Sequence, residues 1–192
     1  MTIQHSAIAD PNIHEPKGVS TAAAGTIYIA NGSGSGSWKP DGGSSYGDLY
    51  ITSGATSQTL SAASAYAILN PTSTWASGVS NGVTLTPASG YIVLSTAGTY
   101  LISFWANFTT AALSAGTAYN FKYAINGTTS TRKLTVTKIS NGADNLHVSA
   151  SGIVTVSAND QLSMYVGGDG TSSSTAITVT EAGLTAVLLK AS

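Results

Sequence analysis

The fold is decided by one stretch, Gly98-Thr99-Tyr100-Leu101-Ile102-Ser103-Phe104-Trp105-Ala106-Asn107-Phe108. Alternate residues from Tyr100 to Phe108 are apolar, as in a strand that buries one face against a core. Leu101 and Trp105 fall on the opposite face, so that face is not simply exposed to solvent. The stretch predicts a long strand with one buried face and a second face that is partly apolar.

Shorter strands surround this stretch, separated by turn residues, from about Leu49 to Leu189. Phe121-Lys122-Tyr123-Ala124-Ile125 alternates up to Asn126-Gly127, a dipeptide typical of a tight hairpin. The last strand is expected from about Ala176 to Leu189. No segment has sustained helical periodicity. About ten short strands at near-even spacing predict an all-β, ten-stranded jelly-roll sandwich over residues 49–192.

Composition narrows the possible partners and chemistry. The chain has 192 residues, of which 42% are hydrophobic and 8% charged, with a net charge of -1 and no cysteine. Disulfides and thiolate metal sites are therefore excluded. Bulk electrostatics favours neither nucleic acid nor an anionic membrane. The N-terminus lacks a signal-peptide pattern, and no stretch approaches the ~18 apolar residues of a membrane span, so we expect no membrane insertion.

The few charges also leave little to keep sheet edges apart, and we expect subunits of an oligomer to cover those edges.

Residues 1–48 differ from the rest of the chain, because they contain too few large apolar side chains to bury a core. Thr26-Ile27-Tyr28-Ile29-Ala30 predicts one short strand, and residues 31–37 read as a Gly/Ser-rich turn or linker. Trp38 follows as an apolar anchor without a local partner. We interpret residues 1–30 as an arm that orders on a partner and residues 31–48 as its tether.

Catalytic and metal-binding patterns are missing from the sequence. The carboxylates are sparse, and no pair, histidine cluster or nucleophile elbow has the spacing that acid–base, metal or hydrolase chemistry requires. We therefore expect no enzyme activity, metal or cofactor. Asp160 is expected to cap its own turn. Trp75 is a candidate for stacking on a sugar. The basic group comprises Lys122, Arg132, Lys133 and Lys138, which are either scattered solvated charges or a site for an anionic sugar.

The segment from Tyr66 to Leu189 resembles the jelly-roll head of complement globular heads and tumour necrosis factor. The similarity rests on Gly98-Thr99-Tyr100-Leu101-Ile102, on the Ser151–Leu162 turn region and on the small-then-aliphatic strand Ala182–Leu189. Asn159 stands where that family usually has Gly. The resemblance implies a homotrimer around an apolar axis. It assigns the trimer interface to Leu101, Trp105 and Leu189.

The N-terminal stretches His14–Gly18 and Ile27–Trp38 resemble the start of tailed-phage head fibres and capsid decoration proteins. This resemblance implies a virion structural protein on the capsid exterior, anchored by residues 1–48 and displaying residues 49–192. Its partner would be the major capsid protein or another shell component. The attachment residues would be Asp10, Pro11, Ile13, His14, Glu15, Pro16, Lys17, Ile27, Tyr28, Ile29 and Trp38.

Two questions about this function stay open at the level of sequence. The same jelly roll and arm would serve a tail-fibre tip that binds a receptor, and only the location on the particle separates the two functions. A host surface glycan is a further candidate partner of the displayed head, with many copies adding avidity.

Overall fold

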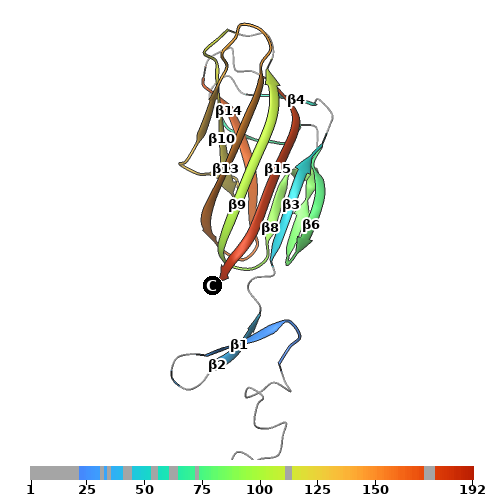
Figure 1. Cartoon of the computed structure of the whole chain (residues 1–192), viewed down its shortest axis with the longest axis vertical. Helices are drawn as coiled ribbons and strands as arrows, with labels where there is room; N and C mark the ends of the chain where they lie inside the picture. Colours follow the sequence, from blue (N-terminus) through green and yellow to red (C-terminus); the bar gives the residue numbers. More distant parts are fainter. Residues whose placement is uncertain are drawn as a thin grey trace, which may run out of the picture. The chain divides into compact units, whose positions relative to one another are not determined.

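The computed structural model describes residues 22–30, 33, 36–40, 45–52, 56–60, 65–71, 74–110, 114–170 and 176–192. The chain divides into two compact units, Met1–Gly42 and Gly43–Ser192. Each unit has its own strands (Figure 1).

The first unit contains an antiparallel hairpin. Strand β1 (Thr26–Ala30) is confirmed as predicted, and it pairs with β2 (Gly36–Pro40). Tyr28 and Trp38 face each other in this register, with their ring centroids 5.4 Å apart in an edge-on arrangement. The interpretation of Trp38 as an anchor without a local partner is therefore wrong, and part of the predicted tether is a strand.

The second unit is a sandwich of two antiparallel sheets. The strands are β3 (Tyr46–Ile51), β4 (Thr56–Thr59), β5 (Ala67–Ile68), β6 (Ala76–Asn81), β7 (Val83–Thr86), β8 (Tyr91–Leu94), β9 (Gly98–Thr110), β10 (Ala118–Ile125), β11 (Thr128–Thr129), β12 (Leu134–Thr137), β13 (Asn145–Val156), β14 (Asp160–Gly168) and β15 (Ala176–Ala191). A 3-10 turn, η4 (Pro87–Ser89), precedes β8. Among the described residues, no helix has the length and hydropathy that a membrane crossing requires.

The strand order follows from the pairing. One sheet has six strands in the order β13-β9-β15-β3-β6, with β4 also on β15; Figure 1 shows β9 and β15 side by side in its middle. The other has seven strands in the order β11-β10-β14-β8-β7, with β12 on β10 and β5 on β14. The described strands thus outnumber the ten expected, because short polar pieces such as β4 and β11 contain no apolar alternation that would predict a strand.

The sandwich begins earlier than residue 49. Strand β3 starts at Tyr46 and pairs with β15 from Tyr46 to Ile51. Gly47, Leu49 and Ile51 are buried in alternation, so the last residues of the predicted tether belong to the sheet. The unit boundary lies between Gly42 and Gly43.

The core confirms the prediction that the 98–108 stretch is a long strand with one buried face. The predicted inward residues Tyr100, Ile102, Phe104, Ala106 and Phe108 are all buried on β9. Phe108 meets the opposite sheet, where its ring centroid lies 5.1 Å from that of Phe121 on β10. Burial of this aliphatic and aromatic layer supplies the main driving force for folding.

Two turns behave as the sequence predicts. Asn126 and Gly127 both have positive φ, 50° and 76°, as a hairpin turn between β10 and β11 requires. Asn159 has φ 68°, a left-handed conformation that Asn tolerates, which explains how it replaces the Gly of the resembling family. Asp160 caps this second turn as expected, because the Ser157 N–H donates to its Oδ2 at 2.7 Å.

Candidate interaction surfaces

The outer face of the six-stranded sheet carries a row of apolar side chains. The register places Ile153 of β13, Leu101 of β9, Val187 of β15 and Tyr46 of β3 side by side across four strands. Ile153, Leu101 and Tyr46 are 61%, 37% and 40% exposed. We call these four residues the outer apolar row. Apolar side chains that lie side by side on one sheet face make that face a candidate interaction surface.

The two other predicted interface residues lie on the same face. Leu189 is exposed on β15, at the bulge between Leu188 and Lys190. Trp105 is also partly exposed and lies opposite Gly183 of β15. A Cβ added to Gly183 would overlap the Trp105 indole, so the glycine lets the indole lie over the β15 backbone. The structure thus brings Leu101, Trp105 and Leu189 to one face of one sheet.

A polar row crosses the same face further along β9. His147 Nδ1 lies 2.7 Å from Asn107 Oδ1, and Asn107 Nδ2 donates to Glu181 Oε2 at 2.8 Å. These residues come from β13, β9 and β15, and no sequence pattern connects them because their contact depends on the strand register. No group of three or more metal-ligating side chains occurs among the described residues.

The hairpin of the first unit offers a second apolar surface. Ile27 and Ile29 of β1 are exposed, whereas Tyr28 lies on the other face and contacts Trp38. Four of the predicted attachment residues therefore belong to this hairpin. The remaining ones lie outside the described residues: Asp10, Pro11, Ile13, His14, Glu15, Pro16 and Lys17.

Trp75 and Lys138 differ from their predicted settings. Trp75 is only 5% exposed, and its Nε1–H donates to the Leu69 carbonyl at 2.6 Å, so it is unavailable for sugar stacking. Lys138 is 1% exposed and is therefore not a solvated charge.

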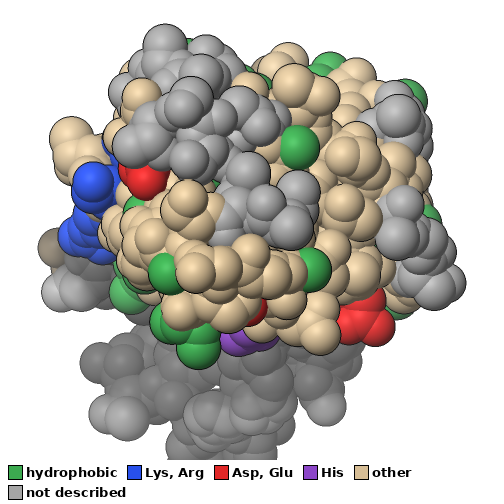
Figure 2. Space-filling model, turned by 90° about the horizontal axis from the view of Figure 1, so that it is seen from above, with side chains coloured by type: hydrophobic (Ala, Val, Ile, Leu, Met, Phe, Trp, Pro, Cys, Tyr) green, Lys and Arg blue, Asp and Glu red, His purple; other side chains and the backbone are tan. Residues whose placement is uncertain are grey.

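Seen from above (Figure 2), the described surface is mainly neutral and polar, in keeping with the few charges in the sequence.

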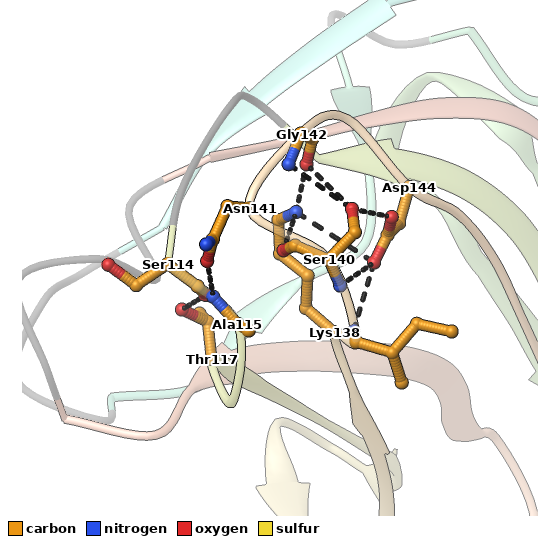
Figure 3. Close-up of polar contacts among 9 residues, drawn as sticks. Ser114, Ala115, Thr117, Lys138, Ser140, Asn141, Gly142 and Asp144 are labelled. Carbon is orange, nitrogen blue, oxygen red and sulfur yellow. Dashed lines mark hydrogen bonds and ion pairs between the residues drawn. The ribbon is translucent and has the colours of Figure 1, made fainter.

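The buried side chain of Lys138 binds several groups of the loop between β12 and β13 (Figure 3). Its Nζ donates to the carbonyl oxygens of Ser140, at 2.6 Å, and Gly142, and lies 3.8 Å from Asp144 Oδ2. Asp144 also accepts hydrogen bonds from the backbone N–H groups of Ile139 and Ser140 and from the Ser140 hydroxyl. The ammonium and carboxylate together organise the loop, as an ion pair with satisfied hydrogen bonds does.

This loop predicts a pH dependence of stability. The Ser140 hydroxyl, assisted by backbone N–H groups and Lys138, lowers the pKa of Asp144 below its usual value. A lowered pKa in the folded state contributes stability above the unfolded value, about pH 4, which is lost as pH falls through the folded pKa. In Asp144→Asn we expect the urea midpoint to fall less steeply below pH 4 than in the natural chain. Equal slopes in the two proteins would refute this role.

Comparison with known proteins identifies the fold. No family model matches the chain, and no curated protein is similar to it in sequence. The tumour necrosis factor Eiger of S. frugiperda is 9% identical, with a TM-score of 0.50 over 77% of this chain and 95% of that one. The globular domain of zebrafish complement 1qA is 13% identical, with a TM-score of 0.46 over 78% of this chain and 99% of that one. The similarity to Eiger confirms that the all-β second unit has a jelly-roll fold like that of tumour necrosis factor.

Proposed function

We propose that this chain is a non-enzymatic virion structural protein, a trimeric head fibre or capsid decoration protein. The N-terminal unit attaches to the capsid, and the jelly roll projects outward and is available to host surfaces. The observation that carries the proposal is the outer apolar row. This row belongs to the second compact unit, whereas the proposed attachment residues belong to the first. The resemblance of the N-terminal sequence to phage head fibres supports a location on the capsid.

The outer apolar row is the basis for the trimer. Three copies related by a closed threefold axis would cover Leu101, Ile153 and their neighbours without leaving an apolar surface free. Trp105 and Leu189 extend the same surface on β9 and β15. Removing the remaining exposed apolar area of these side chains from water, at roughly 25 cal/mol per Å², favours association.

Attachment is tested by deleting residues 1–42 and mixing the shortened chain with capsids that lack the protein. This deletion ends at the unit boundary and retains all of β3. We expect capsid binding to be lost while the shortened chain stays folded. Binding at the level of the full chain would contradict the proposal.

Leu101→Asp in the full chain is the matched control, because it keeps the N-terminal unit and is expected to bind the capsid with reduced avidity. Labelling of intact particles with antibody then distinguishes the head from the tail. Label confined to the tail tip would favour the receptor-binding alternative.

A further inference from the structure

A small apolar cavity opens between the two sheets, on the side where β13 and β12 lie. Its volume is about 150 Å³. The inner wall is formed by Ile102 and Phe104 of β9 and by Phe121 and Tyr123 of β10. Because Ile102, Phe104 and Phe121 are buried core residues, the cavity reaches into the sandwich and is more than a surface depression.

The cavity exists because one strand lacks side-chain volume. On β13 the inward positions are occupied by Val148, Ala150, Gly152 and Val154, and the two small residues lie opposite Phe104 and Ile102 of β9. A Cβ added to Gly152 would have only the Arg132 Nη1 within 4 Å, at 3.8 Å. The sequence thus leaves space here that a larger side chain would fill without a clash.

The mouth of the cavity is positively charged. Arg132 and Lys133, both exposed, belong to the lining and come from the segment between β11 and β12. Ser130 holds this segment, because its N–H donates to the Tyr123 carbonyl at 2.9 Å and its hydroxyl to the Arg132 carbonyl at 2.8 Å. No carboxylate occurs among the described residues that line the cavity.

We propose that this cavity is a binding site for a small monocarboxylate with a compact apolar body, either an aromatic ring or a short acyl chain. An apolar cavity of about 150 Å³ holds a benzene-sized molecule. The apolar body would lie among Ile102, Phe104 and Phe121, and the carboxylate would meet the Arg132 guanidinium, whose planar fork matches it, with Lys133 beside it. This site is independent of the proposed attachment and trimer functions.

The test measures binding of benzoate and hexanoate to the full chain by ligand-observed NMR and calorimetry. Benzyl alcohol and inorganic phosphate serve as the neutral and charge-only probes. We expect saturable binding of at least one carboxylate, with affinities at least about tenfold weaker for benzyl alcohol and phosphate, because one charge-assisted hydrogen bond accounts for such a factor. Arg132→Gln should weaken carboxylate binding by a similar factor.

Gly152→Val places a side chain in the cavity and should abolish binding while leaving the thermal midpoint equal or higher. Lys122→Gln is the matched control, since this lysine neighbours Tyr123 on β10 but does not line the cavity, and it should bind as the natural chain does. No binding of either carboxylate, equal binding of phosphate or benzyl alcohol, or full binding by Gly152→Val or Arg132→Gln would each overturn the proposal.

Discussion

Leu101→Asp is expected to reduce the solution mass from three times the 19.3-kDa chain mass to that of a single chain. Leu101 lies in the middle of the outer apolar row, between Ile153 and Val187. In a trimer the new carboxylate would be buried without a partner, which costs several kcal/mol per copy. In a single chain the same carboxylate reaches water, so folding is retained. Light scattering during size-exclusion chromatography measures the change.

The control for Leu101→Asp is Thr84→Asp. Thr84 is exposed on β7 in the other sheet, and its substitution should leave the mass unchanged. Circular dichroism would verify that both variants fold. A Leu101→Asp protein that keeps the mass of the natural oligomer would exclude the outer apolar row from the subunit interface.

Lys138→Met is expected to lower the free energy of unfolding by about 3 kcal/mol, the order of magnitude for losing hydrogen bonds to a buried charged group. The substitution keeps much of the side-chain volume but removes the donor to the Ser140 and Gly142 carbonyls. Those carbonyls and the Asp144 carboxylate would lose their shared ammonium inside the loop. Urea denaturation at pH 7 and a fixed protein concentration measures the loss.

Lys190→Met is the matched control for Lys138→Met, because Lys190 is exposed on β15. A surface substitution of this kind changes stability by about 0.5 kcal/mol or less. If both variants lose the same stability, Lys138 does not organise its loop through the buried contacts.

Features that depend on local sequence were predictable. Alternation alone places Tyr100 to Phe108 in the core, because successive side chains of a strand point to opposite faces. The Asn126-Gly127 turn and the Asp160 cap depend on the conformations and hydrogen bonds of a few neighbouring residues. The jelly-roll fold followed from combining such local elements with family motifs.

Features that depend on distant partners were not predictable in the same way. The strand containing Trp38 has little apolar alternation and becomes visible only through its pairing with β1. The contacts of Lys138 are an exception, because its acceptors follow it closely in the same loop. Those acceptors are backbone carbonyls, which every residue has, so they leave no pattern in the sequence. The polar row of Asn107 and His147 depends on a register that one sequence does not reveal.

The solution mass of the natural chain, measured alongside a shortened chain that begins at Gly43, is the direct test of the proposed trimer. We predict a mass of three chains for both proteins, because the outer apolar row lies entirely within the second unit. A single-chain mass for both would contradict the trimeric display protein, since the apolar face would then stay exposed in solution.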